Sequence, residues 1–98
     1  MNTFASFGAF VAQEGKTDEL AAALTQAAQF METYPGCKEY RVHIDAEQAD
    51  KIWVYELWVN EQAHAGCLKD PAVRAAIAKG ISLIKDMPHR YKLVPVTP

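Results

Sequence analysis

The sequence predicts an α+β domain in which helices pack on one face of a four-stranded antiparallel sheet. Two observations predict it. Strand-like and helix-like patterns follow one another in the order β-α-β-β-α-α-β, and the run at 52–59 is apolar on both of its faces. That order is the split βαβ, or ferredoxin-like, plan. With neither a linker nor an internal repeat, residues 1–98 are expected to form a single domain.

The first half of the chain is expected to hold a strand, a helix and a second strand. Residues 4–11 carry three Phe among small residues, which is typical of a strand. Thr17 is expected to be the N-cap of a helix that ends near Thr33, because Pro35 disfavours helical backbone at the residue before it. Residues 38–45 alternate between apolar and polar side chains, which predicts a half-exposed strand.

The second half opens with a polar reversal and a strand, and then has two helix-start signals. Asn60 is a good N-cap, and Asp70 followed by Pro71 is a typical helix start. After Asp70, apolar residues recur at helical spacing as far as Ile84. We therefore expect a strand at 52–59, a short helix at about 61–69, and a longer helix that begins at Pro71 and is ended by Met87-Pro88. A loop at His89 should follow, and then a last strand at 90–96, which Pro95 marks as an edge or terminal strand.

The strands at 4–11 and 52–59 are apolar on both faces, although helices cover only one face of such a sheet. A second copy of the chain, packed sheet against sheet, would cover the other face. The sequence therefore predicts a homodimer with two-fold symmetry. Residues expected in the interface are Trp53, Tyr55 and Leu57, and those expected beneath the helices are Ile52, Val54, Glu56 and Trp58.

Composition and charge exclude several function classes. The net charge of −2, with no run of Lys or Arg, gives no electrostatic footprint for nucleic acid. No apolar stretch is long enough to span a membrane, and the N-terminus lacks the features of a signal peptide. Cys37 and Cys67 are expected to be free thiols, which predicts a cytoplasmic protein.

Four local motifs are spread over almost the whole chain: the Pro35-Gly36 turn, the Glu56-Leu57-Trp58 run, the helix at 60–68 and the helix start at 70–73. Together they resemble the antibiotic biosynthesis monooxygenase domain family. The resemblance implies a dimeric α/β barrel. It also implies a monooxygenase that needs no metal or flavin, although the same fold hosts haem-degrading enzymes and proteins of other roles.

The resemblance also bears on single residues. Trp58 is implied as an aromatic wall of a pocket. Many members have a His nine residues after that Trp, where this chain has Cys67. The haem-degrading branch is implied to use Asn, Trp and His where this chain has Phe7, Cys67 and Ile77, so haem degradation is not expected.

Glu56 and His64 are the candidate catalytic residues. A carboxylate is rarely buried without a partner, and burial raises its pKa, so Glu56 is a candidate base. The alternative is a structural ion pair with Arg74, Lys79 or Arg90, or a position at the sheet edge. His64 lies three residues before Cys67 on one helix face, where it is a candidate acid or base, and no third metal ligand has suggestive spacing.

Phe4, Phe10, Trp58 and Cys67 are the candidate substrate-binding residues, with Tyr40 as a further wall, and the alternative is that they only fill the core. Two functions follow. One is a cofactor-independent monooxygenase that oxidises a small aromatic hydroquinone or a polyketide-like phenol with dioxygen. The other is a non-catalytic dimer of the same fold that binds a small aromatic ligand. A purely structural dimer would have no cavity.

Overall fold

The structure is a computed structural model and describes residues 3–97. In chain order its elements are β1 (Phe4–Ala12), α1 (Thr17–Met31), β2 (Cys37–Ile44), β3 (Lys51–Trp58), α2 (Glu61–Cys67), α3 (Pro71–Ile81) and β4 (Ile84–Leu93). The strands form a sheet in the order β2-β3-β1-β4, with antiparallel neighbours throughout. This arrangement confirms the predicted α+β, ferredoxin-like plan.

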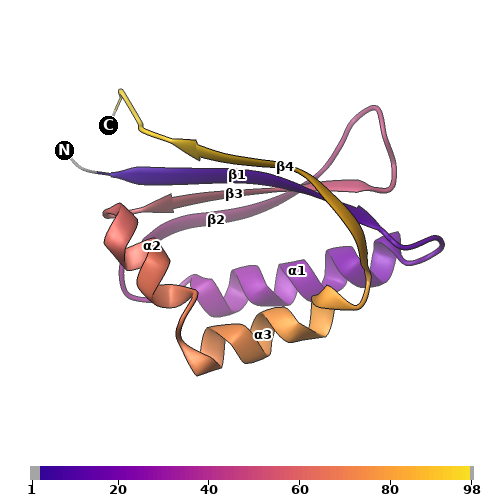
Figure 1. Ribbon diagram of the computed structural model, residues 1–98, viewed down its shortest axis with the longest axis horizontal. Coiled ribbons are helices and arrows are strands. Elements are labelled where there is room, and N and C mark those ends of the chain that lie inside the picture. The colour runs from indigo at the N-terminus through magenta and orange to yellow at the C-terminus, as the bar shows by residue number, and fades with distance from the viewer. Residues whose placement is uncertain (1–2, 98) are drawn as a thin grey trace.

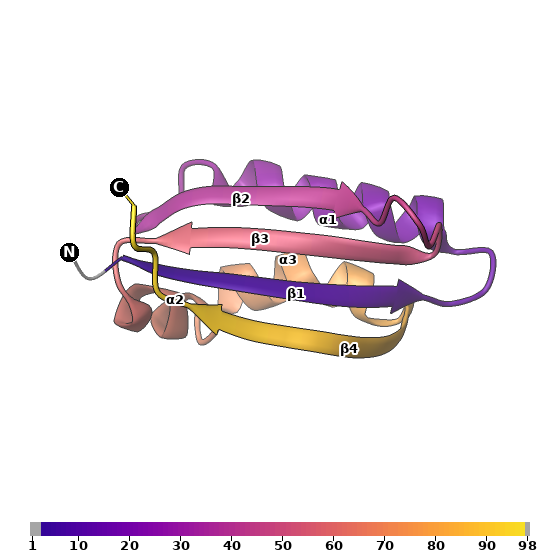
Figure 2. The ribbon, with the colours of Figure 1, turned by 90° about the horizontal axis from the view of Figure 1, so that it is seen from above.

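The molecule has two layers. Helices α1 and α3 lie side by side beneath one face of the sheet, and α2 packs near one end of it (Figure 1). The other face of the sheet, seen from above, has no helix of residues 3–97 over it (Figure 2). No helix of the described part is long and apolar enough to cross a membrane.

The strand register fixes which side chains face the helices. The pairing of β1 with β3 places Ser6 opposite Glu56 and Gly8 opposite Val54. Because side chains two apart share a face, these positions lie on the same side as the buried Ile52. The predicted helix-facing residues of β3 are therefore confirmed: Ile52, Val54 and Trp58 are buried, and Glu56 is mostly so.

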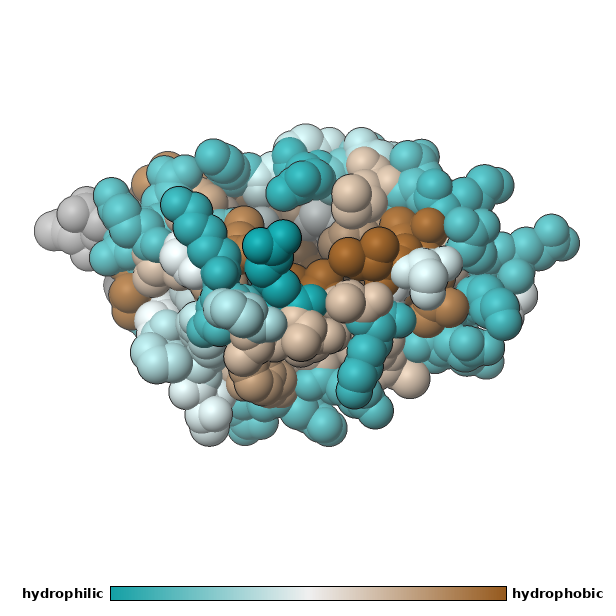
Figure 3. All heavy atoms as spheres, turned by 60° about the horizontal axis from the view of Figure 1, so that its bottom comes forward, coloured by the Kyte–Doolittle hydropathy of each residue, from teal (hydrophilic) through white to brown (hydrophobic). Residues whose placement is uncertain are grey.

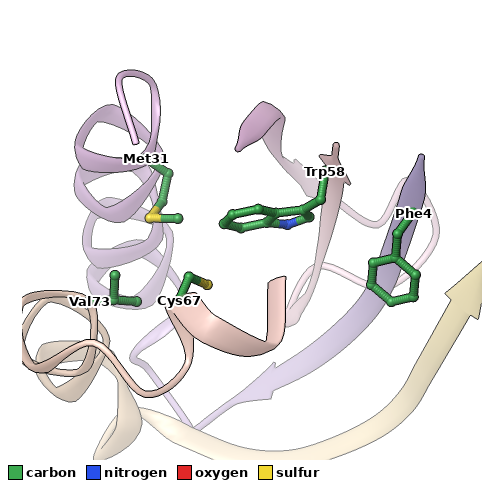
Figure 4. Close-up of a cluster of buried hydrophobic side chains, with 5 residues drawn as sticks. All are labelled: Phe4, Met31, Trp58, Cys67 and Val73. Carbon is green, nitrogen blue, oxygen red and sulfur yellow. The ribbon is translucent and has the colours of Figure 1, made fainter. Parts of the chain in front are cut away.

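Two buried clusters fill the space between sheet and helices. One is formed by Ala12, Leu20 and Ile52. The other surrounds Trp58, whose side chain extends from β3 toward Met31 on α1 and Cys67 on α2 (Figure 4). The middle rows of the sheet face, between these clusters, are where space is left over.

The helix starts are as predicted for α2 and α3 but not for α1. Asn60 accepts a hydrogen bond from the Ala63 backbone nitrogen at 2.7 Å, and Asp70 accepts one from that of Ala72 at 2.9 Å. Thr17 is not an N-cap, since it is the first residue of α1 and Lys16 before it makes no side-chain cap. The helix ends at Met31, slightly before the predicted end.

The predicted long helix from Pro71 is correct as far as Ile81 and wrong only in its C-terminal part. Helix α3 ends at Ile81, and the backbone nitrogen of Leu83 closes the turn on the Gly80 oxygen at 3.0 Å. Ile84 still packs on the Leu20 cluster, but it does so from the first residue of β4. β4 is an edge strand with mostly exposed side chains, so its sequence shows no continuous apolar pattern that would mark it as a strand. The helical spacing between Ile81 and Ile84 was therefore coincidental.

The last strand therefore begins earlier than predicted and ends earlier. β4 includes His89, which was expected in a loop, and stops before Pro95. The pairing with β1 is irregular between Ala9 and Val11, opposite Pro88. An edge strand with a bulge tolerates proline, because that position donates no ladder hydrogen bond.

Candidate functional site

A cavity of about 340 Å³ lies between the helix-facing side of the sheet and the helices. This side of the molecule is hollowed, with hydrophobic side chains inside and hydrophilic ones around the rim (Figure 3). A purely structural dimer would have no such space. Its apolar walls come from strands β1, β3 and β4, from helices α1 and α3, and from the residue that follows α2. The side chains that form them are Phe10, Leu24, Val54, Leu68, Ile77 and Ile84.

The floor of the cavity can be followed across the sheet from the strand register. One row runs from Tyr40 on β2 through Glu56 on β3 and Ser6 on β1 to Lys92 on β4. This row is polar on every strand. Its members all line the cavity.

The next row is apolar and small, except at its outer end. It runs through Val42, Val54 and Gly8 to Arg90 on β4. A Cβ atom built on Gly8 would meet only the His89 backbone oxygen, at 3.4 Å, and no other atom within 4 Å. The glycine therefore leaves open space in the cavity, and no other side chain packs into the place that a Gly8 side chain would take.

Glu56 extends toward the cavity from the polar row. The indole nitrogen of Trp58 donates a hydrogen bond to Oε1 of Glu56 at 3.1 Å. Only 18% of the Glu56 side chain is exposed. Burial raises the pKa of Glu56 above its ordinary value, and the bond from Trp58 opposes that rise. The pKa is thus moved toward the range in which a carboxylate can act as a base near neutral pH.

The group that faces Glu56 is His64, and the expected structural ion pairs are not formed. Nε2 of His64 lies 3.7 Å from Oε1 of Glu56, which is too long for a hydrogen bond. Within residues 3–97 Glu56 makes no salt bridge with Arg74, Lys79 or Arg90. Nor does it lie at an edge, because β3 is flanked by strands on both sides.

His64 reaches the cavity from α2, and its ring rests on two aromatic side chains. The ring centroids of Phe4 and Trp58 lie 5.3 and 5.5 Å from that of His64. Burial lowers the pKa of His64, and the positive charges of Lys92 and Arg90 lower it further. A neutral imidazole can accept a proton, so His64 and Glu56 together form a site that can take one up.

Tyr40 adds a hydroxyl on the far side of Glu56. Burial raises its pKa, and the neighbouring Glu56 carboxylate raises it further. The phenol therefore stays protonated at neutral pH and can donate a hydrogen bond. The only signal for Tyr40 in the sequence was its apolar-face position in a predicted strand.

The structure separates the six predicted site residues into two groups. Phe10, Glu56 and His64 line the cavity. Phe4, Trp58 and Cys67 belong to the buried cluster beside it, where Trp58 is fully buried (Figure 4). From that cluster Trp58 and Phe4 hold the two candidate catalytic groups in place.

Cys67 is also too inert to act as a nucleophile. Burial raises the pKa of its thiol to about 12. Its side chain lines a separate space of about 30 Å³, which shares Tyr40 and Glu56 with the main cavity. Within residues 3–97, no three His, Cys, Asp or Glu side chains are grouped as a metal site would require.

Among the cavity residues that were not anticipated as site residues are Ser6, Gly8 and Lys92, and Arg90 had been expected only as a possible ion-pair partner of Glu56. Ser6 and Gly8 share the helix-facing parity of Phe4 and Phe10, so the strand pattern contained a signal for them. Arg90 and Lys92 depend on the register of β4 against β1, which the sequence did not show.

A family model for antibiotic biosynthesis monooxygenase matches residues 4–79. The chain belongs to the antibiotic biosynthesis monooxygenase family. The resemblance found in its sequence motifs is thereby confirmed. No curated protein sequence matches the chain.

Several solved structures share the fold of this chain. A candidate antibiotic biosynthesis monooxygenase from Chloroflexus aurantiacus J-10-fl is 33% identical, with a TM-score of 0.87 over 99% of this chain and 96% of that one. A candidate monooxygenase from Deinococcus radiodurans is 25% identical, with a TM-score of 0.84 over 97% and 94%. SnoaB from Streptomyces nogalater, a cofactor-independent oxygenase, is 12% identical and shares the fold, with a TM-score of 0.85 over 100% and 97%.

Proposed function

We propose that this protein is a monooxygenase that oxidises a small aromatic hydroquinone, or a polyketide-like phenol, with dioxygen and without a metal or organic cofactor. Family membership supports the reaction class. The observation that carries the proposal is the placement of Glu56 and His64, two mostly buried proton acceptors, in the wall of a largely apolar cavity.

The chemistry begins with loss of a proton from a substrate hydroxyl. The resulting phenolate is electron-rich and can pass an electron to dioxygen, after which carbon–oxygen bond formation gives a hydroperoxide. The hydroquinone in total loses two hydrogen atoms and gains one oxygen atom. The second oxygen atom leaves as water, so the substrate supplies both electrons and no other reductant is consumed.

The Glu56–His64 pair acts as the base. His64 is neutral, so its Nε2 atom can accept the hydroxyl proton, and the Glu56 carboxylate beside it stabilises the imidazolium that forms. Trp58 keeps Glu56 aimed at His64 through its indole hydrogen bond. Phe10 provides an aromatic wall for the substrate ring.

We further propose that the chain acts as a homodimer whose interface is the open face of the sheet (Figure 2). That face carries an aromatic stack: Trp53 lies 4.6 Å from Phe7 and 5.3 Å from His89, measured between ring centroids. Trp53 and His89 both pair across Ala9, whose small side chain they cover. Such a continuous aromatic surface is typical of an interface between identical subunits.

An alternative is a dimer that binds a small aromatic ligand and does not turn it over. The observation in its favour is Cys67, which stands where many family members have a His and which is buried and unreactive. In that case the cavity and its charges would serve recognition alone.

Oxygen uptake with a panel of hydroquinones separates the two functions. The monooxygenase is expected to consume dioxygen above the uncatalysed rate and to release no hydrogen peroxide. His64→Gln and Glu56→Gln should each lower kcat/KM by roughly a hundredfold, whereas Glu14→Gln, a change of the same kind in the exposed turn before α1, should have no effect. Ligand-dependent rises in melting temperature without oxygen uptake would favour the binding protein.

A further inference from the structure

Two cationic side chains on β4 line the cavity, and β1 separates their strand from that of Glu56. Arg90 and Lys92 both line the cavity, and both share the helix-facing side of the sheet with Gly8 and Ser6, their partners on β1. The walls around them are largely apolar. The cavity therefore has a proton-accepting end and a positively charged end.

The two cations differ in their availability to a ligand. Nζ of Lys92 donates to Oε2 of Glu61 at 3.1 Å, which ties β4 to the start of α2. Within the part of the chain that the structure describes, the exposed side chain of Arg90 makes neither a hydrogen bond nor a salt bridge. Its guanidinium group is free to bind an anion, and its planar fork matches a carboxylate through two parallel hydrogen bonds.

The charge of Arg90 acts within the same cavity as His64. Arg90 contributes to the lowering of the His64 pKa, which places its field at the candidate base. An anionic ligand held on Arg90 would offset this field. The protonated form of His64, which arises when the substrate hydroxyl is deprotonated, would then be favoured.

The distance between the two ends suits one aromatic ring with a short side chain. Glu56 on β3 and Arg90 on β4 are separated by β1, so two strand spacings, about 10 Å, lie between their strands. Between them the floor is formed by Ser6, whose side chain is small, and by Gly8, which has none, and this leaves the space open. A ring can lie over this floor with a hydroxyl at one end and an acidic group at the other.

We infer that the substrate is an aromatic acid: a hydroquinone whose ring carries a carboxylate on a short side chain. The carboxylate binds Arg90, and the ring lies over Ser6 and Gly8. The reacting hydroxyl then faces His64 and Glu56. This inference rests on the proposed monooxygenase function for its reaction, but the binding it describes can be measured without turnover.

The test compares two ligands that differ only in charge, 2,5-dihydroxyphenylacetate and 2,5-dihydroxyphenylacetamide. The methylene group separates the acid or amide from the ring, so the two hydroquinones have similar ring electronics. Binding is measured anaerobically by calorimetry, and oxygen uptake is measured separately. The acid is expected to bind at least about tenfold more tightly than the amide at low salt.

Variants of β4 locate the effect. Arg90→Gln should remove the preference for the acid, whereas Arg90→Lys should keep part of it, since lysine retains the charge but loses the fork. Lys85→Gln removes a charge from the same strand at an exposed position outside the cavity, and it should leave the preference intact.

The outcomes separate this inference from the proposed function. Equal binding of acid and amide, or a preference that survives Arg90→Gln, would overturn the inference; oxygen uptake with neutral hydroquinones would then still support the monooxygenase. An Arg90-dependent preference without any oxygen uptake would uphold the inferred ligand class and overturn the monooxygenase instead.

Discussion

Gly8 offers the sharpest separation between what the fold needs and what the cavity needs. It lies in the middle of β1, and its φ angle is not positive, so the backbone does not require glycine there. A Cβ atom would have ordinary contact with the His89 backbone oxygen and open space elsewhere. Glycine inside a strand costs roughly 0.5–1 kcal/mol of stability relative to alanine. The protein is therefore less stable with glycine at this position than it would be with alanine.

Gly8→Val should recover that stability and block the cavity. We expect the free energy of unfolding to rise by about 0.5–1 kcal/mol, because a β-branched residue suits a strand. A methyl group is about the size of a water molecule, whose share of liquid volume is roughly 30 Å³, so the three carbons of valine would fill about a quarter of the 340 Å³ space. Ligand affinity, or KM for a hydroquinone, should worsen by at least about tenfold.

The assay pairs urea denaturation with ligand binding on the same preparation. Gly66→Ala is the matched control, because Gly66 is exposed on α2 and a Cβ atom there meets no other atom within 4 Å. It should gain about 1 kcal/mol of stability and leave binding unchanged. A Gly8→Val protein that is less stable than the wild type yet binds ligand normally would refute the reasoning.

Three further predictions concern the charged site, the interface and the thiols. Burial raises the pKa of Glu56 in the folded state above its unfolded value of about 4.3, so the Glu56 carboxyl lowers stability as pH rises above that value, whereas the lowered pKa of His64 adds stability as pH rises toward 6.5. Glu56→Gln, whose amide oxygen can still accept from Trp58, removes only the first contribution, so its stability relative to wild type should rise with pH in urea denaturation at pH 4–8. Light scattering should give about 22 kDa, twice the 10.9 kDa chain, and Tyr55→Arg should give the single-chain mass; a wild-type mass of one chain would disprove the dimer. Burial raises the pKa of Cys37 to about 11 and that of Cys67 to about 12. A thiol reagent at pH 8 should therefore label neither residue within minutes unless urea is added. Rapid labelling of Cys67 in the native protein would contradict its buried position.

The fold and the candidate base Glu56 could be predicted from the sequence, because side chains must alternate between the two faces of a strand. Apolar positions on both faces of 52–59 placed Val54 and Glu56 on the same side as Trp58, and the register agrees. The N-caps at Asn60 and Asp70 were equally local, since each depends on a side chain bonding to backbone two or three residues away.

What the sequence could not provide depends on long-range geometry. β4 is an exposed edge strand, so few of its side chains are buried, and its pattern does not distinguish strand from helix or loop. Arg90 was therefore unplaced until the strand was paired with β1. Phe4 and Phe10 share a strand face, yet His64 of α2 packs on Phe4 while Phe10 packs on the Leu20 cluster and lines the cavity, and no local pattern separates these two environments.

The central claim is that the cavity at Glu56 and His64 inserts oxygen into an aromatic substrate. Turnover of a hydroquinone under ¹⁸O₂, with a chelator present and no added flavin, tests it directly by mass spectrometry of the product. We expect one labelled oxygen atom in the product for each dioxygen consumed, no hydrogen peroxide, and loss of labelling in His64→Gln. Unlabelled quinone accompanied by hydrogen peroxide, or uptake no faster than the uncatalysed reaction, would contradict the claim.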